Sequence, residues 1–336
     1  MDLATIWFLL IGVLLVGYAV LDGFDLGAGI LHLFVARDDR ERRTVMAAIG
    51  PVWDGNEVWL LTGGGALFAA FPAVYATVFS GFYLALMLLL VALILRAVSL
   101  EFRSHVEWPA WRLAWDVAFA VGSFLPALLF GVALGNVLEG LPLTDGEYRG
   151  GLIGLLNPFA LLVGLLAVAM VVQHGGAWLA LKTEGQVEER ARRAAAFGWL
   201  AFGLLWLVAT AAAPSAAPHL ADSLGRPLAW LAAAAFVLAM AAVRWALARR
   251  RDVLAFAASG GSIAAVWAIV GAALYPNLVP ASGDGQALTV AGASSSQLSL
   301  TVMLVVALVG MPLVIAYTAF IYSRFRGKVR LEDGAY

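Results

Sequence analysis

Residues 45–71, VMAAIGPVWDGNEVWLLTGGGALFAAF, have the length and apolar character of a membrane-spanning helix, yet they contain Asp54, Asn56 and Glu57. A charged side chain at the centre of a bilayer costs about 3 kcal/mol even on insertion scales. Two carboxyl groups and an amide in one span therefore indicate a functional site. Three glycines follow at residues 63–65, and small residues allow another helix to approach closely.

The composition identifies a polytopic membrane protein. Of the 336 residues, 62% are hydrophobic and only 13% are charged, whereas soluble domains are about 25% charged. The absence of cysteine excludes disulfides, iron–sulfur clusters and thiolate-bound haem or zinc. The first residues, MDLATIWF, lack the basic region and cleavage pattern of a signal peptide, so we expect a retained first helix.

Nine segments are long enough to cross the hydrocarbon core, for which about 20 residues suffice. We predict an all-α polytopic fold in which the spans form two four-helix bundles plus one peripheral helix. The second and third spans meet at residues 71–73, Phe-Pro-Ala, which predicts a tight hairpin. The predicted spans are residues 4–35, 45–71, 74–98, 113–138, 152–181, 194–213, 228–248, 253–275 and 298–322.

The basic residues predict the orientation, because cytoplasmic loops carry an excess of Lys and Arg. With nine spans, every basic residue except Arg149 and Arg226 falls on one side. The N-terminus is therefore predicted outside and the C-terminus in the cytoplasm. The cytoplasmic set is Arg37, Arg40, Arg42, Arg43, Arg96, Arg103, Arg112, Lys182, Arg190, Arg192, Arg193, Arg244, Arg249, Arg250, Arg251, Arg324, Arg326, Lys328 and Arg330.

A weak internal echo suggests how the spans are grouped. GFDLGAGILHLFVARDDRERR in the first span and QHGGAWLALKTEGQVEERARR in the fifth each place a polar, glycine-rich patch before a basic loop. Their separation by four spans would suit two similar bundles. We predict a first bundle with the polar cluster at 1–138, a second at 139–277, and an external loop, ninth helix and cytoplasmic tail at 278–336.

Four acids of the first two spans are predicted at matched depths. At 1.5 Å per residue, Asp25 lies about 18 Å and Asp54 about 16 Å from the inner basic residues. Asp22 and Glu57 lie about 22 and 21 Å deep. Each span carries its two acids at spacing i, i+3, so both share a helix face. Because spans joined by a short loop are normally neighbours, we expect Asp25 level with Asp54 and Asp22 level with Glu57.

These acids cannot all be ionised in a low-dielectric site unless cations compensate them. Either some are protonated or basic groups from elsewhere neutralise them. One interpretation is structural, with the acids bonding to backbone freed near Gly23 and at Gly50 and Pro51. The other is a proton or ion path, which is the default for acids inside a membrane, with Asp25 and Asp54 as its leading members.

Four further side chains extend these interpretations. Asp116, a few residues past Arg112, is either a point where protons enter or a surface ion pair. His174, in QHGG, is either a satisfied core histidine or a partner for a quinone oxygen or an acid. Arg96 and Arg103 are interpreted as inner-interface residues whose side chains extend to the membrane surface.

The histidines do not predict a haem site in this chain. His105 and His219 fall in loops on opposite sides, and His32 lies near an inner helix end. No predicted helix carries the paired, buried histidines that bis-histidine ligation needs. Methionine ligands remain open, but we expect no haem and no metal ion in this chain.

Several motifs resemble subunit II of cytochrome bd-type quinol oxidases. They cover essentially the whole chain in order, and the GFD and WDGN blocks are specific. The short loop between the sixth and seventh spans points to the cyanide-insensitive branch. The motifs are VLDGFDLGAG, PVWDGNEVWLLTGGGALFAAFPAVYA, SGFYLALMLLL, WDVAFAVGSFLPALLFGVALGN, LLNPFALLVG and SSSQLSLTVM.

The resemblance implies a heterodimer in the bacterial cytoplasmic (inner) membrane. A larger subunit I would carry two b-type haems, one d-type (or b-type) haem and the quinol-oxidising loop. A small single-span accessory subunit is a further candidate partner, and no nucleic acid is expected. Together the subunits would oxidise quinol and reduce O2 to water, generating a proton gradient without pumping.

The resemblance also implies roles for individual acids. Asp54, in the WDGN block, would line a cytoplasmic proton route to the haem site, and Asp25, in the GFD block, would be its second member. Asp22 and Glu57 match less diagnostic positions and rank as secondary candidates, as does Asp116. Some members hold a structural quinone in subunit II.

Two rival interpretations remain. A secondary ion- or proton-coupled transporter would also have broken helices and mid-membrane acids. A scaffold subunit without a transport role is the other. Purification separates them, because an oxidase subunit co-purifies with a haem protein that absorbs visible light, whereas a transporter is colourless.

Reporter fusions test the predicted topology. Because the basic residues set the orientation, fusions after Arg43, Arg193 and Arg330 should report a cytoplasmic location, and fusions after Thr144 and Asp284 an external one. A reversed pair of neighbouring fusions would mean that a span is miscounted.

Overall fold

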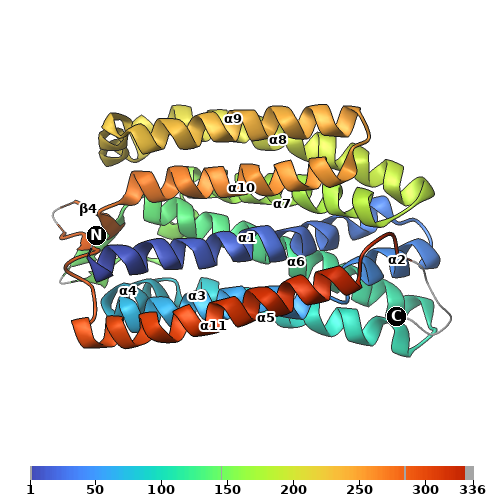
Figure 1. Cartoon of the computed structure of the whole chain (residues 1–336), viewed down its shortest axis with the longest axis horizontal. Coiled ribbons are helices and arrows are strands. Elements are labelled where there is room, and N and C mark those ends of the chain that lie inside the picture. Colours follow the sequence, from blue (N-terminus) through green and yellow to red (C-terminus); the bar gives the residue numbers. More distant parts are fainter. Residues whose placement is uncertain (1, 145, 284, 330–336) are drawn as a thin grey trace.

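The computed structural model describes residues 2–144, 146–283 and 285–329. Its long helices run side by side along one axis, with short loops and strands at the ends (Figure 1). The α-helices are α1 (Leu3–Val35), α2 (Asp39–Ile49), α3 (Trp53–Ala70), α4 (Pro72–Gly81), α5 (Tyr83–Phe102), α6 (Pro109–Glu139), α7 (Pro158–Lys182), α8 (Gly185–Ala216), α9 (Pro227–Ala248), α10 (Asp252–Leu274) and α11 (Gln297–Arg324). The short elements are the 3₁₀ helices η1 (Arg103–His105), η2 (Leu152–Leu156) and η3 (Pro218–Gly225), and the strands β1 (Leu141–Thr144), β2 (Glu147–Tyr148), β3 (Asn277–Val279), β4 (Ala281–Ser282) and β5 (Leu288–Thr289).

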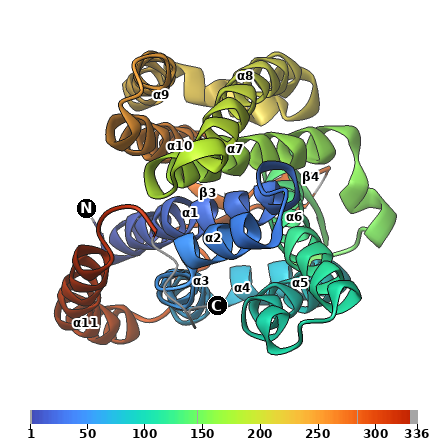
Figure 2. The same cartoon turned by 90° about the vertical axis from the view of Figure 1, so that its right-hand side faces the viewer.

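The central helix is α1. It packs against α3, α6, α7 and α10, and every residue from 22 to 32 is buried (Figure 2). Asp2 caps its first turn by accepting a hydrogen bond from the Thr5 amide at 2.7 Å. The predicted polar patch of the first span therefore lies in the interior of the bundle and faces other helices rather than lipid.

Helices α1 and α7 cross at two glycines. A Cβ on Gly27 would lie 1.9 Å from the carbonyl oxygen of Val171, and one on Gly175 would lie 2.4 Å from the carbonyl carbon of Gly27. The backbones are therefore in direct contact, which only glycine permits at these positions. The two segments of the internal echo meet at this crossing, while the division into two four-helix bundles stays a prediction.

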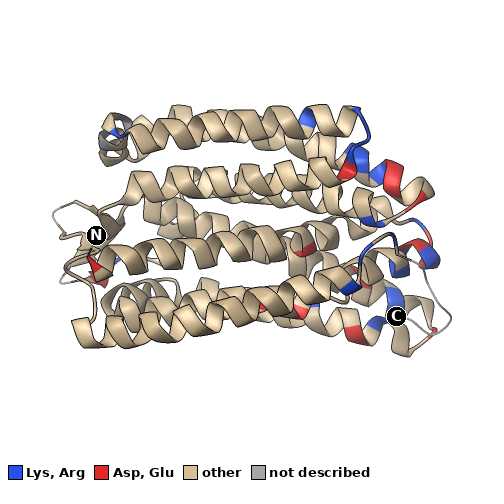
Figure 3. Ribbon diagram, in the orientation of Figure 1, with Lys and Arg blue, Asp and Glu red and all other residues tan. Residues whose placement is uncertain are grey.

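The predicted second span is not one helix. Pro51 has no amide hydrogen to donate and interrupts the helical ladder, so α2 ends at Ile49 and α3 begins at Trp53. Helix α2 lies at the end of the molecule where the basic residues gather, and α3 runs from there toward the opposite end (Figures 1 and 3). The break places Asp54 in the first turn of α3 instead of inside a continuous span.

The predicted hairpin at residues 71–73 is also more elaborate. The chain bends by 120° between α3 and α4, and the following span, α5, begins only at Tyr83. The intervening α4 lies beside β2, and Thr77 donates a hydrogen bond to the Gly146 carbonyl at 2.6 Å. The return to the bundle thus takes two turns separated by a ten-residue helix.

The span count is consistent with the prediction. Within the described residues, eight helices are long and apolar enough to cross a membrane, and the bent pair α3 and α4 brings the number up to nine if it is one span. Lys and Arg gather at the end opposite the N-terminus (Figure 3). The orientation in the membrane stays a prediction.

Small strands join the loops at the other end. Strand β1 pairs antiparallel with β2, with Leu143 opposite Tyr148, and parallel with β4, with Leu141 opposite Ala281. A second pair, β3 with β5, is antiparallel. Ser295, from the SSSQLS motif, satisfies the end of α3 by donating to Ala70 and Ala69 carbonyl groups at 2.8 and 2.7 Å.

Substitution of Gly27 tests the helix crossing. Gly27→Ala should destabilise the protein by about 1–3 kcal/mol, because the added methyl group overlaps the α7 backbone. Gly12→Ala is the matched control on the same helix, since a Cβ there meets nothing within 4 Å. Thermal unfolding of the purified protein measures both, and equal effects of the two substitutions would contradict the close crossing.

Candidate functional site

Five polar side chains from α1, α3 and α5 meet inside the bundle: Asp22, Asp25, Asn56, Glu57 and Arg96. We call this group the acid cluster. The buried Arg96 donates from Nη2 to Asp22 Oδ1 at 2.7 Å and from Nη1 to Asp22 Oδ2 at 3.2 Å. The same Nη1 donates to Glu57 Oε1 at 2.8 Å. Asp22 and Glu57 therefore lie level with each other, as the depth estimate predicted.

The prediction that the Arg96 and Arg103 side chains extend to the membrane surface is wrong. The Arg96 side chain is 0% exposed and that of Arg103 1%, and both are paired with acids inside the protein. Arg96 precedes Arg103 by seven residues and so lies about 10 Å deeper. The sequence did contain a signal for this burial, because Arg96 directly follows the apolar run LALMLLLVALIL. A guanidinium group at such a depth needs a partner inside the protein.

Asp25 has a different environment from Asp22. Its Oδ2 accepts a hydrogen bond from Asn56 Nδ2 at 2.7 Å, and the same nitrogen donates to the Leu21 carbonyl at 3.0 Å. Tyr322 of α11 donates to Asn56 Oδ1 at 3.0 Å. Asp25 Oδ1 has no hydrogen-bond partner within the described part of the chain. Sequence reasoning missed Tyr322, because no pattern links the ninth span to the second.

Asp54 lies on another face of α3. Two residues along a helix differ by about 200° in direction, so with Asn56 buried toward α1, Asp54 points away and is exposed. The exposed face continues through apolar side chains, including Leu61 and Phe68. Asp25 and Asp54 were predicted at the same depth in the membrane. Their carboxyl groups nevertheless do not meet, because they lie on opposite sides of α3.

Asp116 is the centre of a second ion cluster at the basic end. Its side chain is 0% exposed, and its Oδ1 accepts from His32 Nε2 at 2.6 Å and from Arg103 Nε at 2.5 Å. Its Oδ2 accepts from Arg42 Nη1 at 2.7 Å, and Arg103 also donates to Asp39 Oδ1 at 2.9 Å. Asp116 is thus paired, but the pairing is buried and joins α1, α2, η1 and α6.

A third contact fixes α2 to α8. Arg190 donates to both carboxylate oxygens of Glu41, at 2.6 and 2.9 Å, and to the Val35 carbonyl at 2.6 Å. The hydrogen bond from Arg190 holds the pKa of Glu41 below its usual range. Glu41 therefore stays ionised near neutral pH and anchors the helix that precedes α3.

Both ring nitrogens of His174 are engaged inside the chain. Nε2 donates to the Val20 carbonyl at 2.9 Å, and Nδ1 lies 2.6 Å from Ser259 Oγ. The ring stacks on Phe256 with 4.7 Å between centroids and 5° between planes. This is the geometry of a satisfied core histidine, and a quinone oxygen would have to displace one of these bonds.

The histidines do not fit a haem. His174 has both nitrogens occupied, His32 Nε2 is bonded to Asp116, and His105 Nδ1 donates to the Glu101 carbonyl at the basic end. His219 lies in η3 at the opposite end. No group of three His, Asp or Glu side chains among the described residues could hold a metal ion.

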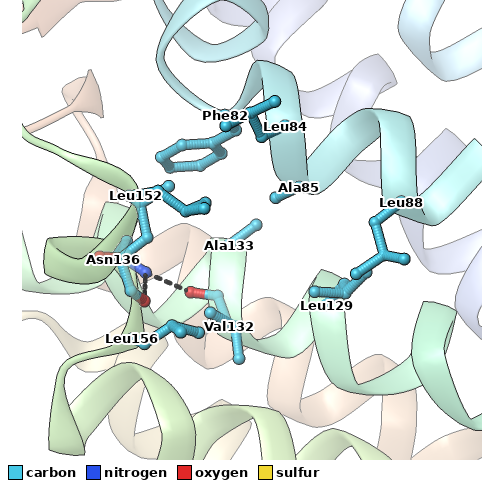
Figure 4. Close-up of a pocket in the computed structure, with 11 residues that line it drawn as sticks. Phe82, Leu84, Ala85, Leu88, Leu129, Val132, Ala133, Asn136, Leu152 and Leu156 are labelled. Atoms are coloured by element: carbon cyan, nitrogen blue, oxygen red, sulfur yellow. Dashed lines mark hydrogen bonds between the residues drawn. The ribbon is translucent and has the colours of Figure 1, made fainter.

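An apolar cavity of about 190 Å³ lies between α5, α6 and η2. Phe82, Leu88 and Leu152 are among the side chains around it (Figure 4). Asn136 is its polar residue, and its amide already donates to the Val132 and Leu155 carbonyl groups at 2.8 Å. The cavity therefore suits an apolar chain, and the Asn136 amide is not free to donate to a quinone head group.

The fold and the acid cluster define a polytopic helical membrane protein with a charge network buried between its spans. A family model described as cytochrome bd terminal oxidase subunit II matches residues 3–325. The chain belongs to this family. It is therefore one subunit of a bd-type oxidase complex, which contains haem, and it works with a subunit I.

Individual relatives are similar over nearly the whole chain. The cytochrome bd-I ubiquinol oxidase subunit 2 of Escherichia coli (strain K12) is 39% identical, covering 98% of this chain and 96% of the relative. The cytochrome bd ubiquinol oxidase subunit 2 of Bacillus subtilis (strain 168) is 35% identical, covering 99% and 98%. A chain of the bd oxidase from Geobacillus thermodenitrificans has the same fold, with a TM-score of 0.78 at 20% identity, over 97% of this chain and 99% of that one.

Asp116→Asn distinguishes a structural from a proton-carrying role. It should destabilise the protein by about 3–5 kcal/mol, because the buried Arg103 and the neighbouring Arg42 would lose the carboxylate that they share, and Arg103 would keep only Asp39. Thermal unfolding of the complex and turnover per haem measure the two effects separately. Reduced turnover per haem in a normally stable complex would instead show that Asp116 carries protons.

Proposed function

We propose that this chain is the haem-free subunit II of a quinol-oxidising bd-type oxidase and that it supplies a proton route from the cytoplasm to the partner. The haem-bearing subunit I would oxidise quinol and reduce O2 to water. Its haems, two of b type and one of d or b type, supply the electron-transfer and oxygen chemistry. The relatives named ubiquinol oxidase subunit 2 support this activity.

The observation that carries the proposal is the position of Asp54. This residue is exposed on a membrane-spanning helix whose exposed face is mostly apolar, with Leu61 74% and Phe68 59% exposed. A carboxylate that faces lipid is costly, so this face is expected to be covered by protein. A second subunit packed on α3 would bury Asp54 at the interface and receive a proton there.

Asp25 is the second member of the proposed route. It lies behind α3, and Asn56 and Glu57 stand on that helix between it and Asp54. Glu57 is partly exposed, with 25% of its side chain accessible, so it lies at the side of the cluster nearest the surface. Asp22 and Glu57 are secondary members, and Asp54 and Asp25 are the acids that exchange protons.

The route accounts for a proton gradient without pumping. Protons consumed in reducing O2 would come from the cytoplasm through this chain, and protons from quinol would be released outside. The complex would reside in the bacterial inner membrane. A small single-span accessory subunit and a structural quinone stay predictions.

The rival interpretations lose support. Family membership over residues 3–325 favours the oxidase over a secondary transporter. A scaffold without a proton route would need no exchangeable proton on the outward face of α3, where Asp54 would only stabilise the first turn of the helix.

Asp54→Asn tests the route. Asn keeps the size of the side chain but has no exchangeable carboxyl proton, so turnover per haem should fall about tenfold or more, within the range of a lost proton-transfer group. Asp54→Glu should retain part of the activity. Glu101→Gln, an exposed acid of α5 outside the cluster, is the matched control.

Haem content must be measured with turnover. If Asp54→Asn loses haem in proportion to activity, Asp54 stabilises the interface only. Normal turnover per haem in this variant would remove Asp54 from the proton route.

A further inference from the structure

Arg96 holds an unusual position for an arginine. It is fully buried and binds acids from two other helices, Asp22 of α1 through two hydrogen bonds and Glu57 of α3 through one. On α6, a Cβ at Gly122 would lie 2.8 Å from the Arg96 backbone nitrogen, so the α5 backbone is also fixed. The guanidinium group is therefore held by α1 and α3, while α6 packs against the backbone that carries it.

The cluster has fewer cations than acids. The groups that face Arg96 are Asp22, Asp25 and Tyr18 of α1 and Glu57 of α3, with Asp54 on the outer face of α3 and Tyr322 of α11 beside Asn56. One guanidinium is thus shared by carboxyl groups that cannot all be ionised in a medium of low dielectric constant.

Hydrogen bonding separates the acids into two kinds. Asp22 and Glu57 bond directly to the permanent positive charge of Arg96. Asp25 bonds instead to the neutral amide of Asn56 and keeps Oδ1 without a partner in the described structure. Because arginine does not give up its proton in proteins, Arg96 itself cannot relay one.

We propose that Arg96 is the positioning residue of the acid cluster: it holds Asp22 and Glu57 in ion pairs, so that Asp25, which bonds to the neutral amide of Asn56, is the acid left to bind and release the transported proton. The proton adds to Asp25 Oδ1 and leaves from it, while the Arg96 charge is constant. This inference rests on the proposed proton route and assigns different tasks to acids that the sequence could not distinguish.

The test uses the assembled oxidase with both subunits. Arg96→Gln should lower turnover per haem several-fold and shift its pH profile toward alkaline pH, because Asp25 loses the nearby positive charge that opposes its protonation. Arg96→Lys keeps the charge and should retain part of the activity and most of the normal profile. Arg190→Gln is the matched control, since Arg190 also binds a carboxylate with two nitrogens but lies outside the cluster.

A combined variant distinguishes charge compensation from packing. Arg96→Gln together with Asp22→Asn and Glu57→Gln removes the cation and both acids that it compensates. The pH profile should then return toward that of the unaltered oxidase, because Asp25 has no charged neighbours that compete for its proton. A variant that keeps the alkaline shift, or an Arg96→Gln oxidase with an unaltered profile, would overturn the proposal.

Two further measurements keep the outcomes separate. Haem content reports assembly, and a loss of haem in Arg96→Gln that the combined variant does not reverse, with a normal profile for the remaining oxidase, would mean that Arg96 is only structural. Asp25→Asn tests the underlying route. If that variant has normal turnover per haem, the proposed function fails, whatever Arg96 does.

Discussion

The pairing of Arg96 with Asp22 and Glu57 is the interaction on which the rest of the structure depends. Hydrocarbon offers no water to solvate these groups, so each must find its partner within the protein. The three side chains come from α5, α1 and α3, and the ion pairs therefore fix the relative height of three spans. Removing one partner would leave an uncompensated charge at a depth where water cannot replace it.

The acids that remain are arranged by the break at Pro51. Because α2 and α3 are separate helices, Asp54 lies in the first turn of α3, where the helix dipole favours a negative charge. The same helix turns Asn56 inward to Asp25 and Asp54 outward. The first turn of α3 thus connects the interior of the protein with the surface that a partner subunit is proposed to cover.

The basic end of the molecule holds this geometry in place. Asp116 binds His32, Arg103 and Arg42, and Arg190 binds Glu41, so α2 is tied to α1, α6 and α8. These contacts fix the start of α3 without any contribution from the acid cluster. A rigid frame around a few exchangeable groups is what a proton route requires, since small displacements break a chain of hydrogen bonds.

The sequence by itself determined the class of protein, the apolar spans, the concentration of basic residues at one end and the presence of deep acids at matched heights. These properties follow from hydropathy and from the rise of a helix, which depend on local sequence alone. Asp22 and Glu57 were correctly placed level with each other for that reason. The family was likewise evident, because GFD and WDGN are continuous motifs.

Only the tertiary structure decided which groups face one another. The break at Pro51 separates α2 from α3, so the side chains of α3 do not continue the helical faces of α2. Which of them point inward could therefore not be read from one continuous predicted span. Arg96 was misplaced because charge counting assigns arginines to loops and does not consider pairing with acids of other helices. Tyr322 and Asn56 are 266 residues apart, and such a contact results from packing that no local pattern records.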